Sequence, residues 1–378
     1  MIKNSILFLI TILFFCGCKI ISKENKTLLF VGSFTDKKPG KGIHIYEFNE
    51  ETGSATLRFT IDNITNTSFQ KLSPDGNFLY SVVDSQMKYN GKIAAFKVDI
   101  DSVKIDLLNM QDCGGLNPAH LAIDKTGKYL VNSNYSDGSL SLFQIKDDGS
   151  LSVAKQVLQF KDSSVVKNRQ EASHIHSSNF SPDNKYLFVH DLGADNIRKF
   201  KFYNTESRLE PSSEVKIKLG NGPRHFTFHP NGNFGYGINE LSGTIDAYQY
   251  KNGNLIWIED YQTYQQKQNI YRAADLHTSS DGNFLYASIR EPKENSIVVY
   301  AINKENGKLQ LIEHKDTGGV HPRNFAISPS GNYVLVANQF SNNISIYKRD
   351  SKTGKLIKIP NQIKVNSPSS IQIFNYQL

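Results

Sequence analysis

Histidine and arginine recur along this 378-residue sequence at intervals of roughly fifty residues, each time at the start of a short apolar stretch. Five of the ten histidines and three arginines share this position: His120, His174, His176, His225 and His321, with Arg224, Arg272 and Arg323. Imidazole can accept and return a proton near neutral pH, and guanidinium groups bind carboxylates, phosphates or a developing oxyanion. These residue types at one recurring position predict proton-transfer chemistry beside a stabilised negative charge.

The recurring positions belong to an internal repeat. A turn related to Ser-Pro-Asp-Gly-Asn, followed by an apolar strand, occurs six times and is anchored at Gly76, Gly127, Asn184, Gly232, Gly282 and Gly331. The intervals between these anchors are 51, 57, 48, 50 and 49 residues. Because proline presets the turn and glycine or asparagine accepts a left-handed backbone, each copy predicts a β-hairpin. An insert at 161–170 accounts for the long interval, and we expect it to form a surface loop.

Each repeat is predicted to hold four strands. Residues 78–83 are an example of the second strand, which follows the turn; 139–145 and 244–250 are examples of the third, and 308–314 of the fourth. Four antiparallel strands in so short a unit cannot bury both faces alone, whereas radial stacking of such sheets makes a β-propeller. Segments 28–34, 42–49 and 55–61 match strands two to four of a unit whose first strand is 368–374. We therefore predict an all-β fold over residues 27–378: a seven-bladed β-propeller of four-stranded antiparallel blades, its last blade closed by N- and C-terminal strands.

Propeller geometry brings the recurring residues to one face. The loops that enter the innermost strands and the loops that join second and third strands emerge together around the central channel. The second of these loop sets carries Asp84, Tyr135, Asp191, Glu240, Arg290 and Gln339. We expect a basic, imidazole-rich cleft on this face that holds a few acids. The alternative is that these histidines only hydrogen-bond the loop backbones.

The N-terminus carries a targeting signal. Lys3 precedes an apolar stretch at 6–15, and Phe15-Cys16-Gly17-Cys18 resembles a bacterial lipobox. We expect residues 1–17 to be a lipoprotein signal peptide, Cys18 to be lipidated, and residues 18–26 to form a polar tether. This predicts a protein of the bacterial cell envelope, periplasmic or surface-exposed, whose lipid anchor makes the membrane a partner. The alternative is an uncleaved signal anchor or an ordinary secretory peptide.

Composition excludes other classes of function. Hydrophobic residues at 39% and charged residues at 21% exclude a disordered chain. The formal charge of +7 suits anionic partners, but the basic residues form no run of five, so we expect no nucleic-acid binding. A closed ring has no free sheet edge, which favours a monomer. We expect no cofactor and no metal, since no cysteine cluster is present; a divalent ion among Glu240, Asp191 and Asp275 is the alternative.

Four stretches carry a family resemblance. The segment 222–230, Gly-Pro-Arg-His-Phe-Thr-Phe-His-Pro, followed by Asn-Glu-Leu at 239–241, resembles the most characteristic sequence of the seven-bladed propeller lactonases. The segments 176–183, 272–277 and 322–325 match the same family, and the similarity spans residues 28–378. This family includes the propeller-type bacterial 6-phosphogluconolactonase and fungal carboxymuconate-lactonising enzymes. The resemblance implies a catalytic cleft made of His176, Arg224, Glu240 and Arg272, with Arg323 as a further member.

On this resemblance, the expected reaction is hydrolysis of a sugar lactone, or of another anionic lactone, as in 6-phosphogluconolactonase. Glu240 or His176 would activate water, Arg224 and Arg272 would hold the oxyanion, and His176 or His225 would protonate the leaving oxygen. Substrate contacts are expected from His120, His225 and Arg323. Relatives in the pentose phosphate route are expected in the cytoplasm, which the N-terminal signal does not match. The alternative function is a surface-anchored module that binds an acidic sugar, peptide or partner protein without turnover.

Overall fold

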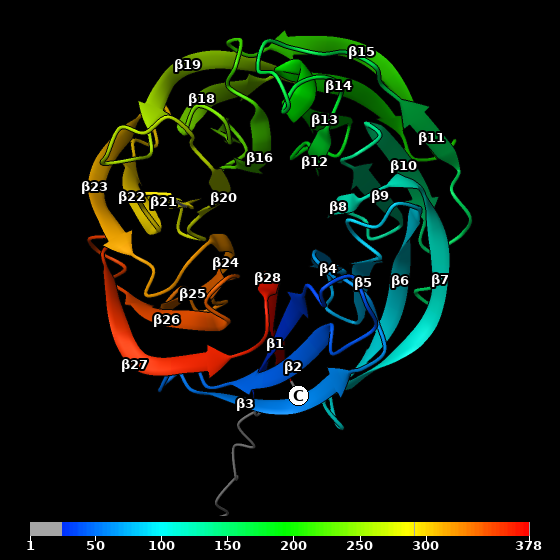
Figure 1. Ribbon diagram of the computed structural model, residues 1–378, viewed down its shortest axis with the longest axis vertical. Helices are drawn as coiled ribbons and strands as arrows, with labels where there is room; N and C mark the ends of the chain where they lie inside the picture. Colours follow the sequence, from blue (N-terminus) through cyan, green and yellow to red (C-terminus); the bar gives the residue numbers. More distant parts are fainter. Residues whose placement is uncertain (1–24, 291, 378) are drawn as a thin grey trace, which may run out of the picture.

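The computed structural model describes residues 25–290 and 292–377. These residues form seven four-stranded antiparallel sheets, which follow one another around a ring in sequence order (Figure 1). The predicted all-β seven-bladed propeller is therefore confirmed. Within the described ranges the one helical element is the 3₁₀ turn η1 (Leu192–Ala194), and no helix is long and apolar enough to cross a membrane.

One blade joins the two ends of the chain, as predicted. From the channel outward it contains β28 (Pro368–Gln377), β1 (Asn25–Ser33), β2 (Ile43–Phe48) and β3 (Ala55–Ile61) (Figure 1). Strand β1 begins inside the segment 18–26 that we expected to be a tether, because Asn25 and Lys26 pair with Gln377 and Tyr376 of β28. The expected signal peptide at 1–17 and the lipidation site at Cys18 lie outside the described residues.

The other six blades each use four consecutive strands, arranged radially around the channel (Figure 1). The first three are β4 (Gln70–Leu72), β5 (Phe78–Val83), β6 (Asn90–Asp99), β7 (Lys104–Leu116); β8 (Pro118–Ile123), β9 (Tyr129–Asn134), β10 (Ser139–Gln144), β11 (Gln156–Gln159); and β12 (Ile175–Phe180), β13 (Tyr186–Asp191), β14 (Asn196–Tyr203), β15 (Arg208–Lys216). The last three are β16 (Pro223–Phe228), β17 (Phe234–Asn239), β18 (Thr244–Lys251), β19 (Asn254–Gln262); β20 (Ala273–Thr278), β21 (Phe284–Ile289), β22 (Ser296–Ile302), β23 (Leu309–Asp316); and β24 (Pro322–Ile327), β25 (Tyr333–Asn338), β26 (Asn343–Arg349), β27 (Leu356–Lys364).

The hydrophobic core lies between neighbouring blades. In one cluster Leu28 and Phe30 of β1 pack with Leu79 of β5 and Phe96 of β6, all at most 1% exposed. Burying a side chain of this size contributes about 1.5–3 kcal/mol. Because each blade completes the core of the next, the inner strands are held at defined positions around the channel.

The turn anchors have the backbone that the repeat predicts. Gly76 has φ of 75°, in the left-handed region that glycine enters without steric cost. Asn184, the one anchor that is not glycine, also has a positive φ of 59°. Its side chain compensates by donating from Nδ2 to Asp124 Oδ2 of the neighbouring blade at 3.0 Å.

Candidate active site

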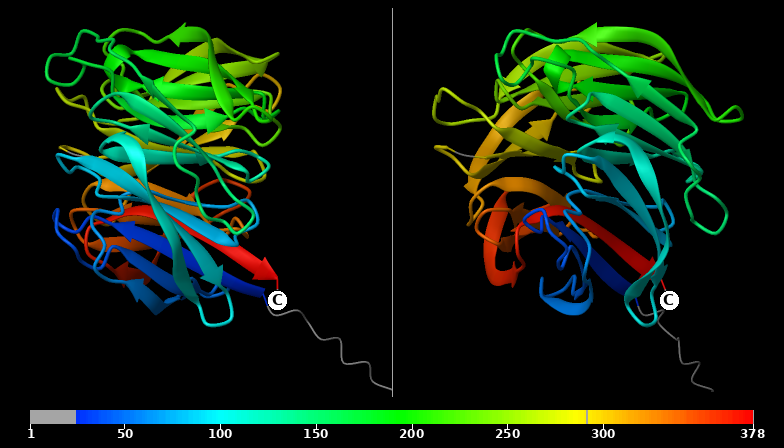
Figure 2. Two further views of the ribbon diagram at one scale, coloured as in Figure 1. Left: turned by 90° about the vertical axis from the view of Figure 1, so that its right-hand side faces the viewer. Right: turned by 45° about the vertical axis from the view of Figure 1, so that its right-hand side comes forward.

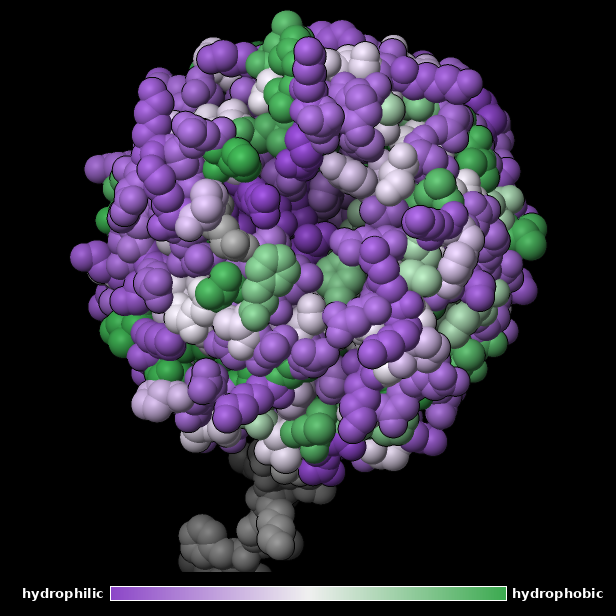
Figure 3. Space-filling model, in the orientation of Figure 1, coloured by the Kyte–Doolittle hydropathy of each residue, from purple (hydrophilic) through white to green (hydrophobic). Residues whose placement is uncertain are grey.

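A cavity of about 170 Å³ lies on the face where the innermost strands begin. The C-terminus, at the end of β28, lies on the opposite side (Figure 2), and the face that carries the cavity has a hydrophilic hollow at its centre (Figure 3). The cavity is lined by Ser68, Ser85, Gln86, Asn117, Ala119, Tyr135, His176, Arg224, Glu240, Arg290 and Arg323. Both loop sets that we expected on one face contribute to it.

β-Bulges in the innermost strands set which side chains reach this cavity. In β8, β12, β16 and β24, strand pairing skips one residue near the start: Ala119, His176, Arg224 and Arg323, respectively. A bulged residue has no cross-strand partner, and the local kink re-aims its side chain. All four of these residues line the cavity. In these four blades the repeat therefore presents one bulged residue to the cavity.

Glu240, which follows β17, binds three arginines. Its Oε2 accepts hydrogen bonds from Arg224 Nε at 2.8 Å and Arg290 Nη2 at 3.0 Å, and its Oε1 accepts one from Arg169 Nη2 at 2.6 Å. Burial alone would raise the pKa of this carboxyl, but the charges of Arg290, Arg224 and Arg169 hold the pKa well below its usual range. A carboxylate engaged in this way is a weak base that holds the arginines in place.

The cavity is strongly cationic. Burial lowers the pKa of Arg224, Arg290 and Arg323 to about 10 in each case, which leaves all three charged at neutral pH. The Arg323 guanidinium lies 5.2 Å from the centre of the Phe34 ring. With Arg169, four guanidinium groups surround one carboxylate among the described residues. Such an excess of positive charge favours an anionic ligand or transition state.

His176 is the one histidine that lines the cavity in the described part of the chain. Its ring packs edge-to-face against Tyr135, with centroids 5.4 Å apart, and its Nδ1 has no hydrogen-bond partner in the described structure. Burial, reinforced by the charge of Arg224, lowers its pKa well below 6.5. The imidazole is therefore neutral at pH 7 and able to accept a proton.

His225 and His120, the expected substrate contacts, are not among the residues that line the cavity. His225 Nδ1 lies 2.8 Å from Asp275 Oδ1, and its Nε2 lies 3.3 Å from Arg224 Nη1. The His120 ring packs against the His225 ring with centroids 5.4 Å apart. His225 therefore contacts the lining residue Arg224, and His120 packs against His225.

Arg272, which we expected in the catalytic cleft, lies beside Arg290. It is not a lining residue of the described cavity; its backbone carbonyl accepts a hydrogen bond from Arg290 Nε at 2.9 Å. In β20 the residues Ala274 and Asp275 lie opposite the single residue Ser288, a bulge of one extra residue as in β16, and the residue equivalent to Arg224 is Ala274. The short alanine leaves room for Arg290, which the sequence places in the loop after β21 but whose role we had not assigned.

Sequence reasoning missed Arg169 altogether. The insert at 161–170 is an irregular loop, as expected, yet Arg169 near its end reaches Glu240. Because the insert occurs in one blade, no repeat position points to it. The alternative cation site also fails to form: Asp191 pairs with Arg198 at 2.8 Å and Asp275 with His225, each apart from the Glu240 cluster.

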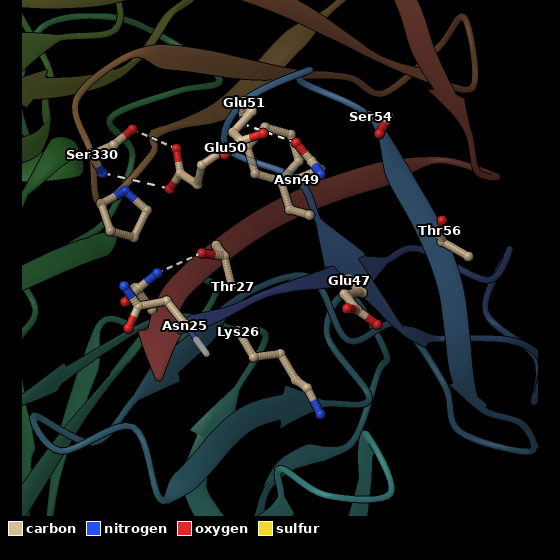
Figure 4. Close-up of a pocket in the computed structure, with 13 residues that line it drawn as sticks. Asn25, Lys26, Thr27, Glu47, Asn49, Glu50, Glu51, Ser54, Thr56 and Ser330 are labelled. Atoms are coloured by element: carbon tan, nitrogen blue, oxygen red, sulfur yellow. Dashed lines mark hydrogen bonds between the residues drawn. The ribbon is translucent and has the colours of Figure 1, made fainter. Parts of the chain in front are cut away.

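A larger cavity, of about 840 Å³, lies on the opposite face beside the start of β1. Its wall includes Glu50, which accepts a hydrogen bond from Ser330 Oγ (Figure 4). Lys26 is the one cation of its described lining, and no histidine is present there. The residue types suited to acid–base chemistry therefore gather at the smaller cavity.

Fold and site together define a β-propeller with a cationic, histidine-containing cavity on its central face. The family model described as "Lactonase, 7-bladed beta-propeller" matches residues 28–373. The chain belongs to this family, which makes it an enzyme of the hydrolase class.

Individual relatives agree over the full propeller. A Formosa agariphila protein named 6-phosphogluconolactonase is 56% identical over 351 residues, 92% of this chain and 99% of that protein. The structure of a Pseudomonas aeruginosa periplasmic gluconolactonase has a TM-score of 0.87 at 30% identity and covers 93% of this chain and 99% of its own. A Bacteroides fragilis structure, provisionally named a 6-phosphogluconolactonase, has a TM-score of 0.86 at 36% identity and covers 92% and 98%.

Proposed function

We propose that this protein hydrolyses a sugar lactone to its acid, in the manner of a 6-phosphogluconolactonase, with His176 as general base. The observation that carries the proposal is a neutral imidazole and three charged arginines lining one small cavity. The 56% identical protein named 6-phosphogluconolactonase supports the class of substrate. The excess of positive charge suits both the developing oxyanion and an acidic product.

The proposed hydrolysis uses water and the residues of the cavity, and its bonds and protons are accounted for without a cofactor. Water bonds through its oxygen to the lactone carbonyl carbon while His176 takes one of its protons, and the carbonyl oxygen becomes an oxyanion. Arg224, Arg290 or Arg323 stabilises that charge as the tetrahedral centre forms. When the centre collapses, the bond between the carbonyl carbon and the ring oxygen breaks, and the His176 imidazolium returns its proton to that oxygen. Glu240 keeps the arginines oriented throughout.

Proton release on glucono-δ-lactone and 6-phosphoglucono-δ-lactone tests the proposal. We expect enzyme-dependent hydrolysis of at least one, and a loss of about 10²–10⁴-fold in kcat for His176→Gln, the range typical of a general base. Because the imidazole is buried against the rings of Tyr135 and His225, kcat is compared well below the melting temperature of the variant, so that the loss reports catalysis and not unfolding. Hydrolysis at the parental rate by this variant would refute the assignment, and ligand binding without turnover would favour the binding module.

We also propose that the enzyme is lipid-anchored through Cys18 and acts in the cell envelope. The lipobox-like sequence supports this location, as does the relative named periplasmic gluconolactonase. Metabolic labelling with a fatty-acid analogue should mark the wild-type chain but not Cys18→Ser. A labelled Cys18→Ser variant, or an unlabelled wild type, would contradict the anchor.

A further inference from the structure

A second cavity, of about 560 Å³, adjoins the active site. Gln86 lines both cavities, so they meet at this residue. The second cavity also contacts the site residues through its aromatic walls: Phe34 packs under Arg323, and Phe340 stacks on His321 with centroids 4.0 Å apart. The active-site cavity, at about 170 Å³, is smaller than most small-molecule pockets, which occupy about 300–1,000 Å³. A ligand that reacts there can extend into the adjoining space, which we name the Phe340 groove.

Phe340 gives the groove an aromatic platform. Its side chain follows β25 and is 55% exposed although one ring face is covered by His321. The uncovered surface lies in the groove, where it offers a flat apolar contact. Aromatic faces of this kind pack against the apolar C–H face of a ring ligand, while the ring's polar edge stays free to form hydrogen bonds.

The rest of the wall is rich in carboxamides. Five of the ten residues that line the groove are Asn66, Gln86, Gln339, Asn342 and Asn366. The amide of Asn66 is engaged within the protein, where its Oδ1 accepts from Thr35 N and its Nδ2 donates to the Ser85 carbonyl, which leaves the other four as candidates for a ligand. A carboxamide both donates and accepts hydrogen bonds, as a sugar hydroxyl does. Oε1 of Gln339 is buried without a hydrogen-bond partner in the described structure. The charged lining residues, Asp36 and Lys37, have opposite signs, so the groove itself selects a neutral polar ligand.

The backbone around the groove is strained. Six of the ten lining residues have a positive φ between 43° and 62°: Asp36, Lys37, Asn66, Gln86, Asn342 and Ser367. Asparagine and aspartate tolerate this region, but lysine, glutamine and serine enter it at a steric cost. Such conformations persist where the surrounding structure enforces them, and they concentrate at ligand sites.

We propose that the Phe340 groove is a subsite for a second, neutral sugar ring. The substrate class would then be a glycosylated aldonolactone, the lactone of a disaccharide acid, with its reacting ring beside His176 and its second ring on Phe340. This inference rests on the proposed function and names its substrate more closely.

A comparison of lactones with one and with two sugar rings tests the proposed subsite. Cellobiono-δ-lactone carries a glucose ring on O4 of gluconolactone, and melibiono-δ-lactone carries a galactose ring on O6. We expect wild-type kcat/KM for at least one of them to exceed that for glucono-δ-lactone about tenfold. Phe340→Ala should abolish this ratio. Trp257→Ala is the matched control, because Trp257 is 57% exposed on β19 and lines neither cavity, and it should keep the wild-type ratio.

Three results would overturn the subsite: equal kcat/KM for one-ring and two-ring lactones in the wild type, an equal loss on both in Phe340→Ala, or a preference for a lactone with an acyl chain. If no lactone is hydrolysed, the proposed function fails but the subsite is still decided by calorimetry with cellobionate and melibionate. Binding of either acid by the wild type that weakens at least tenfold in Phe340→Ala would support the subsite. Absent binding, or equal binding by the two proteins, would overturn it.

Discussion

The arginines of the site act on two ionisable residues at once. Burial lowers the pKa of His176 and the positive charge lowers it further, whereas for Glu240 the positive charge overcomes the effect of burial and lowers the pKa as well. At neutral pH this leaves His176 uncharged and Glu240 fully ionised. Geometry favours His176 over Glu240 as the proposed base: Nδ1 of His176 makes no hydrogen bond in the described structure, whereas the carboxylate is engaged by three guanidinium groups.

Glu240→Gln should therefore destabilise the protein as well as inactivate it. The substitution leaves Arg224 and Arg290 buried without their counter-ion, and breaking a buried pair from one side costs about 3–5 kcal/mol. Urea denaturation measures this loss. Glu206→Gln is the control, since its ion pair with Arg208 is exposed. An inactive Glu240→Gln variant with the parental unfolding free energy would instead restore Glu240 as the base.

The pH dependence of turnover follows from the pKa of His176. A general base must be unprotonated, and the pKa of His176 is lowered well below 6.5, so the acidic limb of activity moves to lower pH. We expect kcat/KM to stay level as pH falls from about 7.5 to about 5.5. A half-maximal point near the ordinary histidine pKa of about 6.5 would show that the burial and charge around His176 do not act in solution.

At the scale of elements, the site depends on small irregularities in regular strands. The bulges of β12, β16 and β24 turn His176, Arg224 and Arg323 toward the channel. In β16 and β24 the bulge follows a proline, which lacks the N–H that a regular ladder would use. The insert at 161–170 adds an element from outside the repeat, whose Arg169 closes the set of arginines around Glu240.

Arg169→Ala tests whether that insert contributes to catalysis. The side chain is one-third exposed and its ion pair is partly screened, so we expect a several-fold fall in kcat/KM and little change in melting temperature. Lys167→Ala, an exposed substitution in the same insert, should leave both unchanged. Parental kcat/KM in Arg169→Ala would mean that the insert only covers the site.

At the scale of the whole molecule, the ring holds only when its ends meet. Strand β28 pairs with β1 along its length, with Ile371 opposite Val31 and Ile373 opposite Leu29 (Figure 1). The same strand packs beside β24 and β4 of the neighbouring blades. Closure therefore fixes the distances between active-site residues that come from different blades.

Substitution of two isoleucines tests how much closure of the ring contributes to the free energy of unfolding. Ile371→Ala, in β28, removes a side chain that is 1% exposed and should lower the free energy of unfolding by about 2–5 kcal/mol. Ile357→Ala, in β27, removes one that is 63% exposed and should change it by less than about 0.5 kcal/mol. Equal effects in urea denaturation would contradict the role given to the closing blade.

The fold could be predicted from the sequence because its signals are local and repeated. The turn sequence around Gly76 and its copies marks each hairpin, and the N- and C-terminal segments together supply the four strands of the last blade. Repeat position also located most of the site, including His176, Arg224, Glu240 and Arg323. These features depend on backbone preference and hydrophobic alternation, which act within a few residues of each other.

Tertiary structure alone decided which of these side chains meet. Arg272 does not line the cavity whereas Arg290 does, and a single-copy insert delivered Arg169. The charge state of His176 likewise depends on groups brought from other blades. Side-chain direction at a bulge and the field inside a closed cavity are set by contacts distant in sequence, and neither leaves a local pattern in the chain.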